Sequence, residues 1–262
     1  MRVLVRGAGD LASGIIYKLV KCGFDVLAIE IDCPSSIRRH VSFSEAVYHG
    51  TCQIEDVVAI KVDSFDEARE IFTKHQVAVM VDRNADILKS QAFDVVVDAI
   101  LAKKNLGTTI DMAPVVIGVG PGFEAGKDCH YVVETKRGHH LGRIYESGCA
   151  IPNTGIPGDI QGFTKERVVH SPYAGTMQCV CHIKDIVKKG ETIALVDGHP
   201  VAATMDGLLR GILPDGFPVT RGLKMADIDP RGDPIKNCDT ISDKARCIAG
   251  GVLEAILRGS SI

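Results

Sequence analysis

The sequence predicts an α/β protein with a doubly wound parallel sheet, followed by a small all-β domain and a closing helix. Three observations support this class. Short apolar strands alternate with helical patterns in the first half, a glycine-rich turn follows the first strand, and glycine-punctuated β segments fill residues 168–231. We expect a first domain at 1–163 and a second at 164–235, with residues 236–262 packing back on the first domain.

The first half supplies the strands and helices of this sheet. Apolar residues recur at helical spacing over 11–21, and Ser64 is a suitable cap for a helix over 66–75. The run 25–31 is nearly all apolar, as is typical of a parallel strand covered on both faces. The expected strands are 2–6, 25–31, 57–62, 77–81, 93–97, 114–120 and 131–134.

The second half contains a faint internal repeat. Gly207 follows Gly175 by 32 residues, Gly222 follows Gly190 by the same interval, and apolar residues recur in phase. Two such halves are expected to close into a small β sandwich or barrel; chance recurrence of a common hairpin is the alternative. An amphipathic helix over 241–258, capped by Ser242 or Asp243, is expected to close the chain.

Composition excludes several classes of protein. The chain has 262 residues, of which 45% are hydrophobic and 24% charged, so a disordered or fibrous chain is excluded. A formal net charge of −3 argues against a nucleic-acid or membrane-surface binder. No apolar run approaches the roughly 18 residues of a membrane span, and the first residues resemble no secretion signal.

Nine cysteines are scattered through the sequence without a CxxC motif, which argues against a disulfide framework. The cytoplasm is therefore the expected location. Cys33 and Cys149 are candidate nucleophilic thiols beside cations. A small buried apolar side chain is the alternative interpretation for each of the nine.

The strongest chemical signal is the turn after the first strand. Gly7, Gly9 and Ala12 fit the pattern G-x-G-x-x-G/A between a strand and a helix, which indicates a Rossmann-like fold. The second glycine lets backbone approach a phosphate, and the helix N-terminus attracts an anion. Asp10 places a negative charge there, which Arg6 is expected to offset.

Two further residues fit a nucleotide at this turn. Glu30 ends the second strand, where an acidic residue binds ribose hydroxyls. Arg38, within Ser35–His40, is a candidate clamp for a phosphate. The alternatives are a turn kept only for packing and a solvated loop.

Other candidates follow the later strands. Asp98 ends a strand at the edge where ligands bind in such sheets, although a helix cap is the alternative. Gly120 and Gly122 belong to a second glycine-rich turn, whose N–H groups are suited to an anion.

A dense polar segment follows the second glycine-rich turn. It provides Glu134, Arg137, His139 and Arg143, types suited to acid–base chemistry and oxyanion binding. Adjacent His139 and His140 make a poor metal site, so no metal ligand is predicted. A basic solvated hairpin is the alternative.

Longer sequence blocks carry a family resemblance. They are GAGDLASG at 7–14, CPSSIRRHVSFSEAVYHG at 33–50, VGPGFEAGKD at 119–128, VVETKRGHHLGR at 132–143 and KMADIDPRGD at 224–233. Together they resemble the YqeB-like family of selenium-dependent molybdenum hydroxylase maturation proteins. The resemblance implies a cytosolic bacterial accessory factor that aids selenation or insertion of the molybdenum cofactor, with the apo-hydroxylase as partner. It supplies no catalytic residue.

The β repeat resembles a biotinyl/lipoyl barrel-sandwich domain, opened by Ser171–Gly175. Such carrier domains modify a lysine on the hairpin between their halves. The corresponding segment here, 197–205, contains no lysine. A docking or lid module is therefore expected instead of a swinging carrier.

These observations favour an accessory protein that binds a nucleotide or molybdenum-cofactor phosphate at the first glycine-rich turn. Glu134 or His139 would move protons, and Arg137 or Arg143 would hold an oxyanion. One alternative is an NAD(P)-dependent oxidoreductase, and another is a non-enzymatic cofactor scaffold. The candidate cofactors are NAD(P) and a molybdopterin-type cofactor. The sequence leaves the oligomeric state open, with a homo-oligomer as one alternative.

Overall fold

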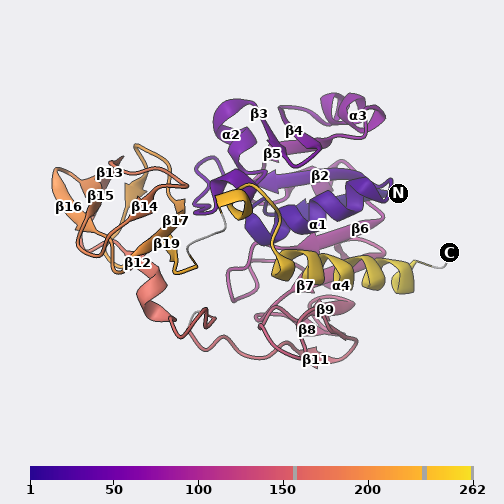
Figure 1. The fold of residues 1–262 in the computed structure, drawn as a ribbon. Helices are drawn as coiled ribbons and strands as arrows, with labels where there is room; N and C mark the ends of the chain where they lie inside the picture. Colours follow the sequence, from indigo (N-terminus) through magenta and orange to yellow (C-terminus); the bar gives the residue numbers. More distant parts are fainter. Residues whose placement is uncertain (156–157, 232–234, 261–262) are drawn as a thin grey trace. The chain divides into compact units, whose positions relative to one another are not determined.

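Two units make up the chain, and the computed structural model describes residues 1–155, 158–231 and 235–260. Unit 1 comprises Met1–Pro34, Ser42–Thr154 and Ile241–Ile262, and unit 2 comprises Ser35–Val41 and Gly155–Thr240 (Figure 1). The chain therefore enters unit 2 twice and returns each time to unit 1. None of the helices in the described ranges combines the length and apolar character that a membrane span requires.

A nine-stranded sheet forms the centre of unit 1. Its strands lie in the order β10-β9-β7-β6-β1-β2-β5-β4-β3. The inner strands pair in parallel, whereas β3 and β10 pair antiparallel at the two edges. The bounds are β1 Arg2–Arg6, β2 Asp25–Glu30, β3 Thr51–Ile54, β4 Val57–Val62, β5 Val77–Val81, β6 Val95–Asp98, β7 Val115–Val119, β9 Tyr131–Val133 and β10 Ile144–Tyr145. A separate ladder joins β8 (Glu124–Ala125) to β11 (Gly148–Cys149).

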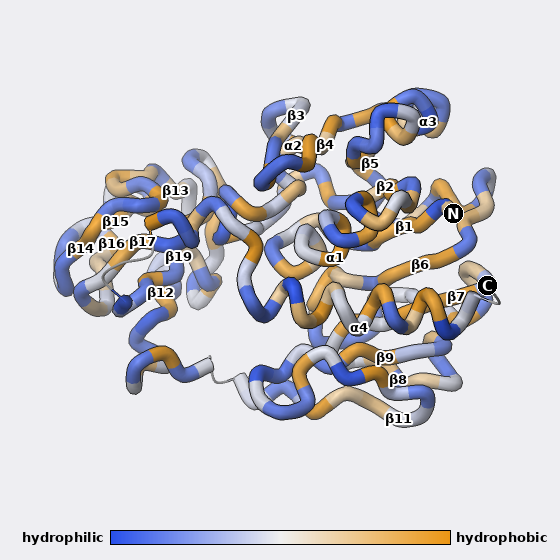
Figure 2. Tube along the Cα trace, turned by 45° about the vertical axis from the view of Figure 1, so that its right-hand side comes forward, coloured by the Kyte–Doolittle hydropathy of each residue, from blue (hydrophilic) through white to orange (hydrophobic). Residues whose placement is uncertain are grey.

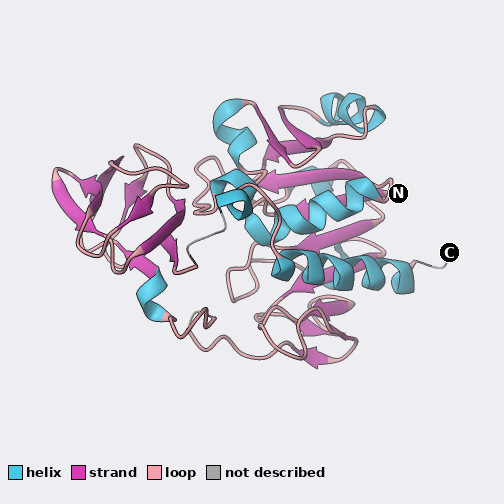
Figure 3. Cartoon of the chain, viewed as in Figure 1, coloured by secondary structure: helices cyan, strands magenta, loops and turns pink. Residues whose placement is uncertain are grey.

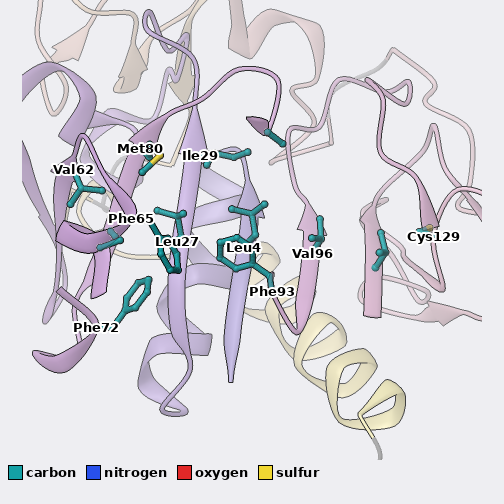
Figure 4. Close-up of a cluster of buried hydrophobic side chains, with 14 of the residues drawn as sticks. Leu4, Leu27, Ile29, Val62, Phe65, Phe72, Met80, Phe93, Val96 and Cys129 are labelled. Atoms are coloured by element: carbon teal, nitrogen blue, oxygen red, sulfur yellow. The ribbon is translucent and has the colours of Figure 1, made fainter. Parts of the chain in front are cut away.

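Helices cover both faces of this sheet. On one face, α3 (Phe65–Thr73) packs on β2, β4 and β5. Leu4, Leu27 and Val96 point to this side and join Phe65 and Phe93 in one apolar cluster (Figure 4). On the other face lie α1 (Asp10–Lys21) and α4 (Asp243–Gly259); a short α2 (Glu45–His49) precedes β3. The inner strands β1 and β6 are strongly apolar, as burial on both faces requires (Figure 2).

Helices α1 and α4 run side by side in the same direction (Figures 1 and 3). The close approach depends on glycine, because a Cβ built at Gly14 would lie 2.7 Å from the Cβ of Ala245. Helix α4 also packs closely on the loop after β9, where a Cβ at Gly251 would lie 2.3 Å from the carbonyl oxygen of Gly142. Because the helices are parallel, both begin at the edge of the sheet where the parallel strands end. Their positive N-terminal ends therefore point to one region of unit 1.

Unit 2 consists of two four-stranded antiparallel sheets. One has the order β12-β19-β17-β14 and the other β16-β15-β13-β18. The segment Ser35–Val41 packs on β17, where a Cβ at Gly211 would lie 2.7 Å from the carbonyl oxygen of Ile37. The bounds are β12 Val168–His170, β13 Gly175–Cys179, β14 Ile186–Val187, β15 Thr192–Val196, β16 His199–Ala202, β17 Gly207–Ile212, β18 Pro218–Val219 and β19 Lys224–Asp229.

The 32-residue repeat is visible in these strands. At this offset β13 corresponds to β17, β14 to β18 and β15 to β19. The two opening glycines also share an environment. A Cβ at Gly175 would lie 2.2 Å from the carboxylate of Asp197, and one at Gly207 would lie 2.5 Å from the carbonyl oxygen of Asp229. The two aspartates also lie at the repeat interval, although one contact is made by a side chain and the other by the backbone.

The fold-class prediction, a Rossmann-like doubly wound sheet plus a small barrel-sandwich domain, was wrong. The sheet of unit 1 is mixed, and its connections from β5 to β6 and from β6 to β7 contain only the short 3-10 helices η2 (Asp86–Lys89) and η3 (Ile110–Met112) in place of covering helices. The β segments of unit 2 form two separate sheets and no closed barrel among the described residues. Apolar runs located the strands, but they carry no information about pairing direction or closure.

Candidate functional site

The turn between β1 and α1 requires glycine at its first position. Gly7 has a φ of +95°, and a Cβ there would lie 3.0 Å from the carbonyl oxygen of Ala99 at the end of β6. Its N–H donates to the carbonyl of Ile29 at 2.8 Å, which fixes the turn against β2. The buried Ala8 and Ala12 let α1 pack closely on the sheet.

The start of α1 differs chemically from the starts of α3 and α4. Gly9 is the N-cap residue of α1, with φ −73° and ψ −175°, and no side chain caps this helix. At α3 and α4, Ser64 and Ser242 accept hydrogen bonds from Glu67 and Ala245. The first N–H groups of a helix have no partner within it. The first turn of α1 therefore directs donors and a positive dipole toward the sheet edge.

The carboxylate of Glu30 lies on the glycine-rich turn. Its oxygens accept the N–H groups of Ala8 and Ile31, each at 2.9 Å. Burial raises the pKa of Glu30, and these two hydrogen bonds oppose the shift. Glu30 thus positions the turn, and its oxygens retain further acceptor capacity for hydroxyl groups.

Arg6 and Asp98 form a buried pair between β1 and β6. Arg6 Nη1 lies 3.3 Å from Asp98 Oδ2 and also donates to the hydroxyl of Thr108. Arg6 Nη2 donates to the carbonyl of Leu106 at 3.2 Å, and Asp98 accepts the N–H of Ile100 at 3.1 Å. The guanidinium that we expected to offset Asp10 therefore holds the loop that follows β6.

Glu134 is fully buried and accepts four hydrogen bonds. Its Oε1 accepts the N–H groups of Thr135 and Lys136 at 2.8 and 2.7 Å. Its Oε2 accepts the N–H of Ile151 at 2.8 Å and the hydroxyl of Tyr145 at 3.3 Å. A carboxylate with this many donors positions the loop around it.

Arg137 and Lys244 bring positive charge to the start of α4. Arg137 makes two contacts with the carboxylate of Asp243, at 2.7 and 3.2 Å. Burial lowers the pKa of Lys244, and Arg137 lowers it further, whereas Asp10, Glu134 and Asp243 act in the opposite direction. These five residues, Asp10, Glu134, Arg137, Asp243 and Lys244, are called here the helix-start cluster.

The second glycine-rich turn has its own steric requirements. Gly120 and Gly122 have φ values of +85° and +112°. A Cβ at Gly120 would lie 2.8 Å from the hydroxyl of Thr135, and one at Gly122 would lie 2.6 Å from the backbone of Lys104. The turn thus packs against the loops that follow β6 and β9.

His139 and Arg143 lie on the exposed part of the loop after Glu134. The ring of His139 packs edge-on against His140, with centroids 5.1 Å apart. Arg143 lines a cleft of 670 Å³ with residues from the second half of α4, including Glu254 and Arg258. Arg143 therefore belongs to a different part of the surface from the helix start.

The remaining candidates are dispersed. Arg38 belongs to unit 2, where its Nη2 donates to the carbonyl of Asn237 at 3.1 Å. Cys33 is half-buried, and its sulfur lies 3.6 Å from the hydroxyl of Tyr48. Cys149 is exposed on β11. Across the described ranges, no three His, Cys, Asp or Glu side chains gather as metal ligands would.

Sequence reasoning missed Lys244 and the role of Asp243. Asp243 was noted only as a helix cap, and Lys244 follows it in the same first turn. The available signal was a lysine in the first turn of an amphipathic helix, where cations are unfavourable. The packing of α4 beside α1, which turns that position into part of a site, is a tertiary feature.

No known family model matches the chain. It is 48% identical over 255 residues to the uncharacterized protein YqeB of Escherichia coli K12, an alignment that covers 97% of this chain. The similarity to YqeB extends over nearly the whole of this chain. The alignment covers 47% of the E. coli protein, so this chain spans about half the length of the curated relative that it matches.

Three solved structures share a remote likeness with this chain. The product-bound ectoine utilization protein EutE from Ruegeria pomeroyi is 12% identical, with a TM-score of 0.27 over 87% of this chain and 84% of that one. An aspartoacylase family protein from Mesorhizobium loti has 12% identity and a TM-score of 0.27 over 87% and 83%. A succinylglutamate desuccinylase/aspartoacylase from Rhodobacter sphaeroides has 15% identity and the same TM-score over 87% and 84%.

Proposed function

We propose that this chain is an accessory protein for the maturation of selenium-dependent molybdenum hydroxylases. In this proposal, unit 1 binds the phosphate or pyrophosphate of a nucleotide-containing ligand at the start of α1. The sequence blocks that resemble the maturation family support the accessory role. A nucleotide-tailed molybdenum cofactor would then be cargo that the protein holds for its partner, an apo-hydroxylase.

The observation that carries the ligand proposal is the uncapped start of α1 beside the start of α4. Gly9 supplies no side-chain oxygen to the first turn of α1. The adjacent helix-start cluster adds Arg137 and Lys244. The backbone donors and positive end of α1, with these two cationic side chains nearby, favour a phosphate or pyrophosphate group.

The surrounding side chains favour a ligand that carries hydroxyl groups beside its phosphate. Glu30 uses two of its acceptor positions on the turn and keeps others for ribose hydroxyls. Asp10 lies at the first position of α1 and adds a carboxylate to the same region. A nucleoside phosphate supplies both an anion and hydroxyl groups, whereas a bare dicarboxylate supplies only the anion.

Calorimetric titration with NAD, NADP, nucleoside triphosphates and molybdenum cofactor tests this proposal. The decisive variant is Gly9→Asp. The backbone angles at Gly9 suit a capping carboxylate, which would occupy the N–H groups and repel an anion. We expect at least one ligand to bind wild-type protein and to lose roughly tenfold or more in affinity in Gly9→Asp.

The matched control is Ser64→Asp, which places the same carboxylate at the start of α3 in the same unit. It should leave the affinity unchanged. If no ligand binds the wild type, or if Gly9→Asp binds as well as the wild type, the proposal is wrong. Retention of the purified apo-hydroxylase on immobilised protein tests the accessory role separately.

A further inference from the structure

The cleft that Arg143 lines belongs to unit 1 and lies at one edge of its sheet. Its volume of about 670 Å³ falls within the range of roughly 300–1,000 Å³ that is usual for ligand sites. Residues 141–147 form one wall, and Glu254 and Arg258 of α4 form the other. The first wall contains β10, which is the outermost strand of the nine-stranded sheet and has β9 as its neighbour. The cleft therefore combines a strand edge with the side of a helix.

The main-chain groups of Ile144 point away from β9. The carbonyl of Arg143 accepts the N–H of Glu134 at 2.9 Å, so Arg143 occupies a hydrogen-bonded position of the ladder. Successive residues of an antiparallel strand alternate between positions that bond to the neighbouring strand and positions that do not. Ile144, the next residue, therefore directs its N–H and its carbonyl to the outer side of β10. In the described parts of the chain, no backbone hydrogen bond outside the ladder engages either group.

Close packing holds this edge in place. Gly142 has a φ of +78°, and a Cβ there would lie 2.9 Å from the carbonyl oxygen of Cys247 in α4. A Cβ at Gly251 would in turn lie 2.3 Å from the carbonyl oxygen of Gly142. On β10 itself, the hydroxyl of Tyr145 donates to the fully buried Glu134 at 3.3 Å. An incoming strand therefore meets an ordered edge, which reduces the entropy lost on binding.

Two guanidinium groups line the cleft, and they differ in their partners. Arg258 Nη1 lies 2.9 Å from Glu146 Oε1, and its Nη2 contacts the carboxylate of Glu254. The guanidinium of Arg143 is exposed and, within the described ranges, is in no hydrogen bond or ion pair. The cleft therefore offers one uncompensated positive charge. A single carboxylate matches this charge, whereas a multiply charged phosphate is disfavoured by the nearby Glu146 and Glu254.

We propose that the edge of β10 binds an extended acidic segment of a partner protein. The segment adds a strand to the sheet, and the main-chain groups of Ile144 bond to it. The residue beside the one that faces Ile144 then lies opposite Arg143. An aspartate or glutamate at that position forms a cross-strand pair of opposite charge with Arg143. This inference does not depend on the proposed function, because the cleft lies beside the second half of α4 and the proposed anion site lies at the start of α1.

Fluorescence anisotropy with labelled peptides tests the proposal. The probe is a capped peptide of alternating threonine and valine with a central glutamate, and its matched control has glutamine at the centre. We expect wild-type protein to bind the glutamate probe about two- to fivefold more tightly than the glutamine probe. Arg143→Gln should abolish this difference by weakening only the glutamate probe. Arg69→Gln, at an exposed arginine of α3, should behave as the wild type.

Amide hydrogen exchange with water locates the bound strand. The N–H of Ile144 gains a partner in the complex, so its exchange should slow by roughly tenfold at saturation. The N–H of Tyr145 faces β9 and should change less. A charge-reversal pair then separates recognition from a merely structural role of Arg143. Arg143→Glu should reject the glutamate probe and bind a matched lysine probe.

Four outcomes would overturn this inference. They are a wild-type protein that binds no probe, equal affinities for the glutamate and glutamine probes, binding that leaves the exchange of Ile144 unchanged, and a lysine probe that Arg143→Glu does not bind. Sedimentation identifies the competing occupant: if the probes do not bind and the chain self-associates in a manner that Arg143→Gln weakens, the edge pairs with a second copy. None of these results bears on anion binding at the start of α1.

Discussion

The guanidinium of Arg6 lies 3.3 Å from the carboxylate of Asp98, and both residues are almost completely buried. The pair joins the ends of β1 and β6, directly below the turn that leads into α1. It fixes the position of this turn from beneath, and Arg6 also holds Leu106 in the loop after β6. Two residues that sequence patterns suggested as ligand contacts thus support the shape of the site.

We expect Arg6→Gln to destabilise the protein by about 3–5 kcal/mol, because it leaves the Asp98 carboxylate buried without its cation. Urea denaturation measures the change. Lys21→Gln is the control, since it removes an exposed ion pair with Asp56 and should cost about 1 kcal/mol or less. Equal effects of the two substitutions would show that the Arg6–Asp98 pair contributes no more than a surface contact.

Glu134→Gln should destabilise the protein by about 2–3 kcal/mol, because an amide nitrogen then faces N–H donors that a carboxylate oxygen accepts. Denaturation measures this loss. Glu124→Gln removes an exposed partner of Lys127 and serves as the control, with a change of about 1 kcal/mol or less. If Glu134→Gln retains full stability, the four hydrogen bonds do not hold the loop.

Two adjacent glycines in α4 should respond in opposite ways to alanine. At Gly251 a Cβ would meet the carbonyl of Gly142 at 2.3 Å, so Gly251→Ala should cost about 1–3 kcal/mol. At Gly250 the nearest atom is the Lys18 Nζ at 3.9 Å, so Gly250→Ala should stabilise α4 by about 0.5–1 kcal/mol. Thermal unfolding of both variants measures the two effects. A shift of Tm in the same direction for both variants would refute the packing described for α4.

The contribution of Glu30 to stability should decrease as pH rises. Its folded-state pKa is raised by burial, so the folded protein binds this proton more tightly than the unfolded chain does. The stabilisation is complete below the ordinary pKa of a glutamate and is lost as pH rises through the raised value. The free energy of unfolding of Glu30→Gln, relative to wild type, should therefore increase over that interval. If the difference in unfolding free energy between Glu30→Gln and wild type does not change with pH, the raised pKa assigned to Glu30 is wrong.

Local sequence signals located most elements of unit 1. Periodicity and capping predicted the strand before Gly7, the strand that begins at Asp25 and the Ser64 cap of α3. The structure confirms all three. Strand β3 was missed because Thr51–Ile54 lacks an apolar run. The mixed sheet and the two separate sheets of unit 2 depend on pairing between distant segments, which periodicity does not encode.

The candidate site was predicted less completely. The glycine-rich turn was identified from spacing, because a tight turn and a helix start require particular residues at fixed intervals. The hydrogen-bonding partners of Arg6 and Glu134 were not predicted. Asp98 lies 92 residues from Arg6 in the sequence, and Ile151 lies 17 residues from Glu134. Lys244 entered the site only through the packing of α4 on α1.

The central claim is that the first turn of α1 binds an anion, and amide NMR during a pyrophosphate titration tests it most directly. We expect the largest, saturable shifts at the amides of Asp10, Leu11 and Ala12, and their loss in Gly9→Asp. Saturable binding whose largest shifts lie elsewhere in the chain, or no shifts at these three amides, would contradict the claim.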